Sequence, residues 1–183
     1  GGSLAVDGSV LGVEVLGGTL AVTNGGTMHI GTSPTPSGSL LVAGGNMLID
    51  GAGSTVTVAG LTGVGVFAPG MLTISNGGAL KSLIGAEIDA LVQPSFGIST
   101  VTVTGPGSTW NVGGAFGFGL NVGGGTTGGP GVLVIANGGV VNSTTFTTIG
   151  DEFNEGSHVL VTGSGSVLNA FNSLTIGGSS CGC

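Results

Sequence analysis

The sequence of 183 residues has almost no positive charge. It contains one lysine, Lys81, and no arginine, against eight aspartates and glutamates, for a formal net charge of −7. Proteins bind nucleic acid by neutralising phosphates with lysine and arginine, so this composition argues against nucleic acid as a partner. Glycine and polar residues interrupt every apolar run before the ~18 residues that a membrane-spanning helix needs, so no membrane insertion is expected.

Charged residues of both signs are scarce, at 5% of the chain, and tyrosine is absent. The 43 glycines and six prolines alone would suggest a disordered chain. Disorder normally goes with low hydrophobicity and high charge, whereas 40% of these residues are hydrophobic. With few salt bridges available, stability must come from backbone hydrogen bonds and from apolar side chains stacked in register.

One short motif recurs along the chain. In residues 131–150, Leu133 and Ile135 alternate with residues of the opposite strand face, and Asn-Gly-Gly follows, a sequence that tolerates positive φ in a tight turn. A single copy would favour an antiparallel hairpin. The same turn occurs three times, about 50–60 residues apart, which instead indicates stacked repeats. The turn residues are Asn24, Gly25, Asn76, Gly77, Asn137 and Gly138.

A second motif, Gly-x-Gly-Ser, lies between the copies of the first, at residues 51–54, 105–108 and 163–166. The two motifs together predict an all-β solenoid formed as a single elongated domain over residues 1–178. We expect three degenerate super-repeats beginning near residues 19, 71 and 132, after a degenerate first coil at 1–18. Residues 61–70 are expected to form a connecting turn, and residues 86–94 have the only helical character.

Equivalent positions of the repeats predict the core. We expect Val22, Ile74, Ile135, Val103, Val161 and Trp110 to be buried. Trp110 occupies the place of Val56 and Leu168 in the second motif, so we interpret it as a core residue in preference to a ligand-stacking one. His29 alternates with apolar residues and has no second histidine nearby, which favours a solvent-facing strand position over a metal ligand.

Five of the eight acids lie in two loops, residues 86–94 and 151–155. A pair of carboxylates could serve a glycosidase, whereas a lyase would depend on Lys81 as its only cationic group. Asp151, Glu152, Asn154 and Glu155 offer the hard oxygen ligands of a calcium site. Solvated turns explain the same residues more simply, so we expect no catalysis and no cofactor.

The only two cysteines, Cys181 and Cys183, fall in a C-terminal Cys-Gly-Cys tail at residues 179–183 that we expect to be flexible. Two cysteines are too few for a tetrahedral metal site, and a disulfide between residues two apart would be strained. Intermolecular disulfides in an oxidising compartment and inert thiols are both left as interpretations.

The repeats VTVTGPGSTWNVGG, GVLVIANGGVVNSTTFTTIG and HVLVTGSGSVLNA resemble the passenger-domain repeats of bacterial autotransporter, adhesin-type proteins. The resemblance covers roughly residues 19–178. It implies a right-handed parallel β-helix that is secreted to the bacterial surface and acts in adhesion or as an extracellular structural element.

These observations together predict a non-catalytic extracellular structural protein, either a self-assembling subunit of a surface fibre or sheath or the stalk of an adhesin. No polar cap is recognisable at either end of the repeat array, so the expected partner is a second copy bound head to tail. The alternative is a carbohydrate-active or glycan-binding β-helix module that uses loops 86–94 and 151–155 to contact cell-surface glycans.

Overall fold

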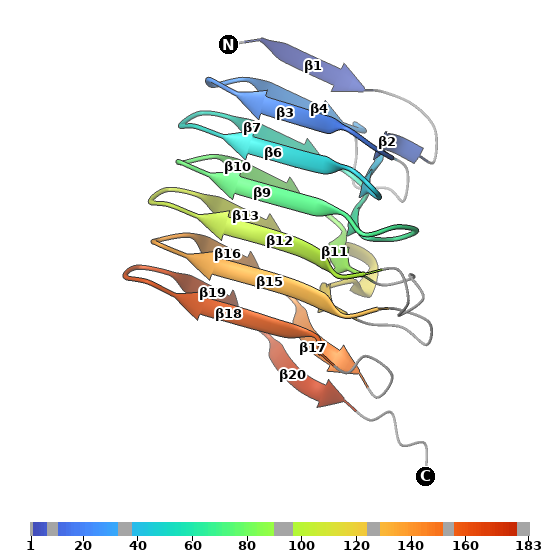
Figure 1. Ribbon diagram of the computed structural model, residues 1–183, viewed down its shortest axis with the longest axis vertical. Helices are drawn as coiled ribbons and strands as arrows, with labels where there is room; N and C mark the ends of the chain where they lie inside the picture. The colour runs from blue at the N-terminus through green and yellow to red at the C-terminus, as the bar shows by residue number, and fades with distance from the viewer. Residues whose placement is uncertain are drawn as a thin grey trace.

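A computed structural model describes residues 2–6, 11–32, 38–89, 97–123, 129–151 and 156–178. Within these residues the chain forms a parallel β-solenoid with three sheets, which confirms the predicted fold class (Figure 1). Each complete coil contributes one strand to each of the three sheets, in the same order along the chain. No helix in the described part of the chain is long and apolar enough to cross a membrane.

The sheets are built from short strands that pair in register with the coils before and after. Sheet A contains β1 (Ser3–Val6), β4 (Thr27–Ile30), β7 (Thr55–Val58), β10 (Ala79–Ser82), β13 (Thr109–Val112), β16 (Val140–Ser143) and β19 (Val167–Ala170). Sheet B contains β2 (Leu11–Val15), β5 (Ser39–Val42), β8 (Leu61–Val64), β11 (Gly85–Ile88), β14 (Leu120–Val122), β17 (Phe146–Asp151) and β20 (Ser173–Gly178). Sheet C contains β3 (Thr19–Thr23), β6 (Asn46–Asp50), β9 (Met71–Ser75), β12 (Ser99–Thr104), β15 (Gly131–Ala136) and β18 (His158–Thr162).

The coils wind in a right-handed sense. In Figure 1 the chain runs leftward along the near strands of sheet C, turns, and returns rightward along the strands of sheet A behind them while it descends. Right-handed crossovers are the rule between parallel strands of one sheet, because they match the twist of the strands.

Alternation within each strand places one set of side chains inside the coil and the other outside. In sheet C the stacked inward side chains of Leu72, Val101 and Leu133 are fully buried, and so are those of Ile74, Val103 and Ile135. Parallel pairing in exact register stacks equivalent residues directly over one another. The core is therefore a set of largely apolar columns that run the length of the stack, with a few buried hydroxyl side chains such as Thr62 and Ser82 among them.

The predicted core positions face this interior, with one difference. Val22, Ile74, Val103, Ile135 and Trp110 are buried. The prediction for Val161 was wrong: it points inward but is 44% exposed. The reason is its place in β18, the last strand of sheet C in the described chain, where no further coil covers it.

Trp110 lies between Leu80 and Val141 in the inward row of sheet A and is fully buried. Its indole Nε1 donates a hydrogen bond of 3.0 Å to the hydroxyl of Ser82, which in turn lies 2.7 Å from the hydroxyl of Thr62. A buried indole N–H needs such a partner. A ligand-stacking role for Trp110 is excluded by this burial.

Two local expectations were wrong. Residues 61–70 include strand β8, and residues 86–88 of the segment with helical character belong to strand β11, whereas residues 90–94 lie outside the described residues. Gly63 in β8 faces outward beneath Val66, whose Cγ2 would lie 2.5 Å from a Cβ at this position. Glycine at this position permits the close approach of a covering loop. Because glycine is rare in strand interiors, residues 61–64 lack the pattern that predicts a strand.

Candidate functional site

The corner between sheets C and A is the most regular feature of the surface. Asn-Gly-Gly and Gly-x-Gly-Ser turns alternate from coil to coil through all six described turns. Asn24, Asn76 and Asn137 adopt φ of 55°, 51° and 51°, and each is followed by a glycine of positive φ. Asparagine is one of the few non-glycine residues that accept this conformation.

A serine hydroxyl joins each Asn-Gly-Gly turn to the following Gly-x-Gly-Ser turn. Gly25 N–H donates to Ser54 Oγ at 3.1 Å, and the corresponding distances are 3.0 Å for Gly77 to Ser108 and 3.1 Å for Gly138 to Ser166. Each serine hydroxyl in turn donates to a backbone carbonyl of its own coil, at 2.6–2.7 Å. We call these three bridges the serine clamps.

Backbone-to-backbone hydrogen bonds join the Gly-x-Gly-Ser turns at residues 51–54 and 105–108 to the Asn-Gly-Gly turns of the following coils. Gly51 N–H donates to the carbonyl of Ser75 at 3.1 Å, and Gly105 N–H to the carbonyl of Ala136 at 3.2 Å. The two kinds of connection alternate, so the structural repeat is a pair of coils. This explains why the two sequence motifs occur in phase.

Asn76 has an additional partner. Its Nδ2 donates to Asp50 Oδ1 at 2.7 Å, and the hydroxyl of Ser75 donates to the same oxygen at 2.6 Å. These two bonds favour the ionised carboxylate, so they lower the pKa of Asp50. The side-chain amides of Asn24 and Asn137 make only long contacts of 3.4 Å, to threonine hydroxyls.

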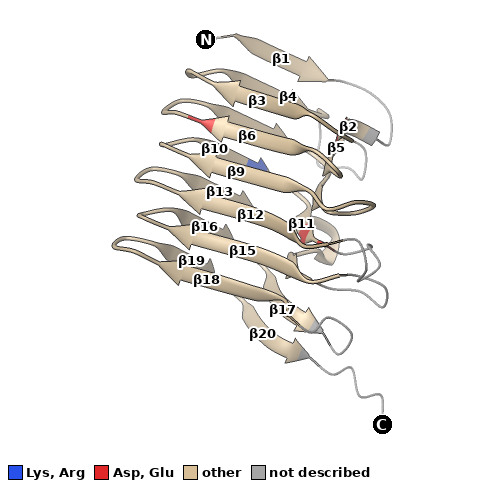
Figure 2. Cartoon of the chain, in the orientation of Figure 1, with Lys and Arg blue, Asp and Glu red and all other residues tan. Residues whose placement is uncertain are grey.

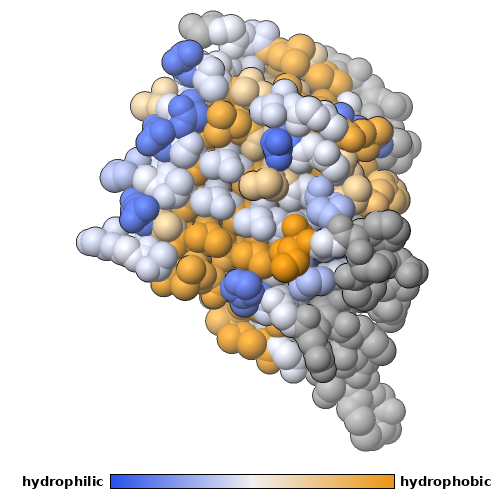
Figure 3. Space-filling view, viewed as in Figure 1, coloured by the Kyte–Doolittle hydropathy of each residue, from blue (hydrophilic) through white to orange (hydrophobic). Residues whose placement is uncertain are grey.

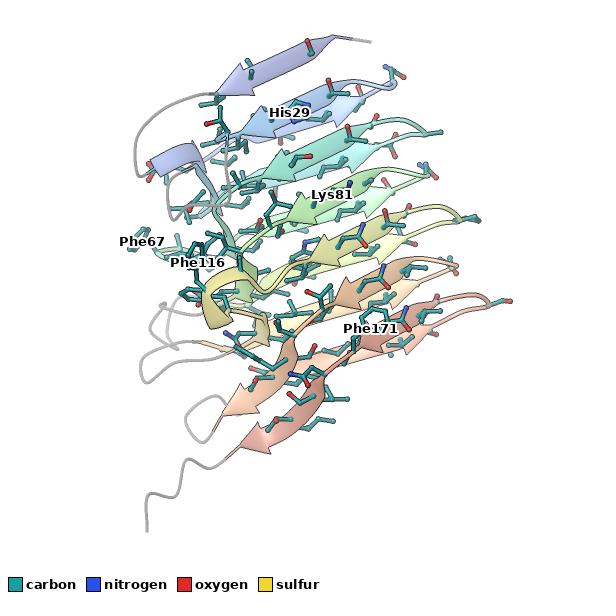
Figure 4. All side chains as sticks on the ribbon, turned by 180° about the vertical axis from the view of Figure 1, so that it is seen from behind. His29, Phe67, Lys81, Phe116 and Phe171 are labelled. Atoms are coloured by element: carbon teal, nitrogen blue, oxygen red, sulfur yellow. The ribbon has the colours of Figure 1, made fainter. Side chains whose placement is uncertain are left out.

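An asparagine ladder runs along the outer face of sheet A. Asn142 Nδ2 donates to Asn111 Oδ1, and Asn169 Nδ2 donates to Asn142 Oδ1, both at 2.8 Å. Register places Lys81 directly before Asn111 in this outward row, and His29 lies in the same row nearer the N-terminus (Figure 4). His29 is exposed, as expected for a solvent-facing residue.

The corner between sheets B and C contains a buried acid. The position after the last inward residue of the B strands is a left-handed glycine in four coils, Gly65, Gly123, Gly150 and Gly177, but Asp89 takes it in the coil between the first two, with φ of 63°. Asp89 is fully buried. Its carboxylate fits because Gly65 and Gly129 leave room beside it: a Cβ at Gly65 would lie 3.1 Å from Oδ1.

Asp89 is only partly satisfied. Its Oδ2 accepts the backbone N–H of Ser99 at 3.0 Å, whereas Oδ1 has no hydrogen-bond partner among the described residues. Burial raises the pKa of Asp89, and the hydrogen bonds from Ser99 only partly offset this rise. A sealed carboxylate cannot touch a substrate, so Glu87 and Asp89 cannot act as a pair of catalytic carboxylates.

Glu87 lies on the outer face of sheet B and is half-buried, and burial raises its pKa. It is one of very few charged side chains along the described coils (Figure 2). Two exposed phenylalanines lie next to this sheet, Phe67 in a loop and Phe116 in the short 3-10 helix η2 (Ala115–Gly117) (Figure 4). Phe116 adopts φ of 62°, an uncommon conformation for a bulky residue.

Several predicted site residues cannot be placed. Glu152, Asn154, Glu155, Cys181 and Cys183 lie outside the described residues, as does most of loop 86–94, and only the backbone of Asp151 is described, at the end of β17. Within the described ranges, no three His, Cys, Asp or Glu side chains come together in a group that could hold a metal ion.

Both ends of the described stack leave interior surface uncovered. At the C-terminal end Ile176 is 70% exposed and Leu174 49% exposed, although both lie in inward rows of sheet B. On the face seen in Figure 3, apolar side chains gather over the last coils. At the N-terminal end a cavity of about 340 Å³ opens beside β3, lined in part by Leu4, Leu20 and Met28.

The N-terminal cavity has a simple origin. Within the described residues sheets A and B have seven strands each but sheet C has six, so β1 and β2 extend one coil beyond β3. The edge of β3 on this side therefore has no partner strand in the described part of the chain.

The fold defines the chain as a parallel β-solenoid repeat protein. Its sequence matches no protein-family model, and neither curated proteins nor solved structures give a significant match. The serine clamps, the asparagine ladder and the position of Asp89 are features that sequence reasoning missed. The ladder had a detectable signal, because Asn111, Asn142 and Asn169 stand at one offset after successive turns.

Proposed function

We propose that this protein is a non-catalytic extracellular structural element, a subunit of a surface fibre or sheath or the stalk of an adhesin, and that its coils continue into a second copy. The observation that carries this proposal is the exposure of inward-facing apolar residues at both ends, including Ile176, Leu174 and Leu4. Exposed strand edges and uncovered apolar columns are the surfaces that another coil would cover.

The two ends are complementary in kind. The last strands β18, β19 and β20 present the trailing edges of three parallel sheets, and β1, β2 and β3 present the leading edges. A contact between unlike ends of identical copies is heterologous and does not close, so it propagates as a filament. The resemblance to passenger-domain repeats supports the bacterial surface as the location.

The proposal is tested by replacing Ile176 with Asp. The charge would face the interior of an added coil, where an unpaired carboxylate is costly, so we expect Ile176→Asp to abolish assembly. Thr175→Asp is the matched control, because Thr175 is the neighbouring outward residue of the same strand. Light scattering over a concentration series, with electron microscopy, measures the outcome.

Wild-type protein that stays as dispersed short rods at every concentration would contradict assembly through the ends. Equal loss of assembly in both variants would show that general surface charge, and not burial of Ile176, controls the association.

A glycan-binding module is the second candidate. Two observations favour this candidate. Glu87 is half-buried with a raised pKa, and perturbed carboxyl groups concentrate at functional sites. The exposed Phe67 and Phe116 lie near the same sheet. Glycan-array binding that is lost in Glu87→Gln and in Phe116→Ala would support this candidate. Unchanged binding in both variants, or no binding by the wild type, would count against it.

A further inference from the structure

The three Asn-Gly turns combine a reactive sequence with a structural restraint. Asparagine is among the chemically labile residues, and its lability is greatest before glycine, whose backbone nitrogen is not shielded by a side chain. Asn24, Asn76 and Asn137 are all exposed to solvent. In each turn, water therefore reaches an asparagine side-chain amide that can react with the backbone nitrogen of the following glycine.

The reaction needs the nitrogen of the following glycine. This nitrogen attacks the side-chain Cγ, loses its proton and forms a cyclic succinimide, while the side-chain amide leaves as ammonia. Water then opens the ring at either carbonyl and gives aspartate or isoaspartate. The net change is the addition of one water and the loss of one ammonia, with no oxidant or metal.

In this structure the attacking nitrogen is always engaged by the next coil. Gly25, Gly77 and Gly138 each donate their N–H to a clamp serine at 3.0–3.1 Å. Because the hydroxyl proton of each serine is already given to a backbone carbonyl, its oxygen is committed as an acceptor. The clamp holds the nitrogen toward the neighbouring coil and retains its proton.

We propose that the three Asn-Gly turns are latent sites of self-modification to aspartate and isoaspartate, and that the serine clamps suppress this reaction. Isoaspartate inserts an additional backbone carbon into a turn that must stack in register with its neighbours. Conversion at one turn would therefore disrupt the register between that coil and its neighbours. The rate of conversion sets the chemical lifetime of the solenoid.

The clamps are unequal, which ranks the sites. Asn76 is held best, because Ser108 is fully buried and Asp50 also restrains the side-chain amide at 2.7 Å. Asn24 has a fully buried clamp, Ser54, but only a 3.4 Å contact at its amide. Asn137 is held least, because Ser166 lies in the last described coil and is only half-buried. The expected order of reaction is Asn137, then Asn24, then Asn76.

Mass spectrometry of proteolytic peptides tests the proposal after incubation of the folded protein in mildly alkaline buffer. Urea-unfolded protein is the reference, in which the three sites should react at similar rates. In the folded protein we expect all three to be slower, in the stated order. Ser166→Ala should accelerate conversion of Asn137 alone by about three- to tenfold, the scale of one lost hydrogen bond.

Ser164→Ala is the matched control, because Ser164 is exposed in the same turn and takes no part in the clamp. Ser166→Thr retains the hydroxyl and should restore most of the protection. Circular dichroism checks that each variant is folded. If Ser166→Ala has lost the fold, Ser54→Ala takes its place, and conversion is then measured at Asn24. Equal rates in folded and unfolded protein, or an unchanged rate at Asn137 in folded Ser166→Ala, would overturn the proposal.

Discussion

The chain turns at two corners that border sheet C, and neighbouring coils contact one another differently at the two corners. At the corner with sheet A, every turn is short and each stacks on its neighbours through the serine clamps or backbone bonds. At the corner with sheet B, the connections vary from three residues after β5 to ten after β11, and one of them carries the buried Asp89. A corner fixed by cross-coil bonds tolerates little variation, whereas a corner that is only covered by loops accepts insertions and side chains.

The largest loss of stability is expected for a substitution at the corner between sheets C and A, where the stacked turns leave no space for a side chain. A Cβ at Gly139 would clash with the backbone carbonyl of Val103 in the preceding coil. Backbone cannot yield as a flexible side chain can, so we expect Gly139→Ala to lower the free energy of unfolding by about 2–4 kcal/mol. Urea denaturation followed by circular dichroism measures the change.

Gly26 provides an unusually close control for this substitution. It occupies the same turn position as Gly139, but no C strand of a preceding coil lies against it in the described chain, and its nearest neighbour is the carbonyl of Thr23 in its own turn at 3.0 Å. Gly26→Ala should therefore cost much less than Gly139→Ala. Equal losses would show that local backbone preference, and not contact between coils, demands glycine here.

A smaller effect is expected when one serine clamp is removed. Ser108 is fully buried, accepts the N–H of Gly77 and donates to the carbonyl of Thr104 at 2.7 Å. Ser108→Ala leaves both backbone groups without their partner, and such losses cost about 1–3 kcal/mol. Thermal unfolding should show a clear fall for Ser108→Ala and almost none for Ser164→Ala. A neutral Ser108→Ala would mean that the clamp positions the turn without stabilising it.

The smallest effect is expected at the irregular corner, and it depends on pH. The pKa of Asp89 is raised in the folded protein, so the folded state holds its proton more tightly than the unfolded state does. Its contribution to stability is fully present below the unfolded pKa of about 3.9 and is lost as pH rises through the folded value. At neutral pH the buried carboxylate is a cost.

Asp89→Asn removes this cost and keeps a residue that accepts positive φ. We expect Asp89→Asn to be more stable than the wild type by roughly 1 kcal/mol at neutral pH, because the Ser99 N–H retains an acceptor in both proteins. The difference should shrink on acidification. Parallel denaturation series across pH measure it, and Glu87 and Asp50 cancel because both proteins contain them. A stability difference that does not change with pH would contradict a raised pKa at Asp89.

Much of the architecture was predictable because the repeats encode it locally. Asn24, Asn76 and Asn137 marked the turns, and alternation around Ile74 and Ile135 identified the inward face. Strand β8 was not predictable, since Gly63 and Thr62 break the apolar alternation for reasons that lie in other coils: Val66 folds over Gly63, and Ser82 pairs with Thr62. The exposure of Val161 follows from its place in the last coil, which no local pattern reports.

The sequence by itself determined a coiled, parallel, all-β chain with a two-motif period, because turn chemistry and strand alternation act over a few residues. Only the tertiary structure decided which groups meet between coils. The serine clamps join residues 28–31 positions apart, and Asp89 is buried by glycines of two other coils. Such contacts depend on the register in which one coil lies on the next, and that register is set by the packing of the whole stack.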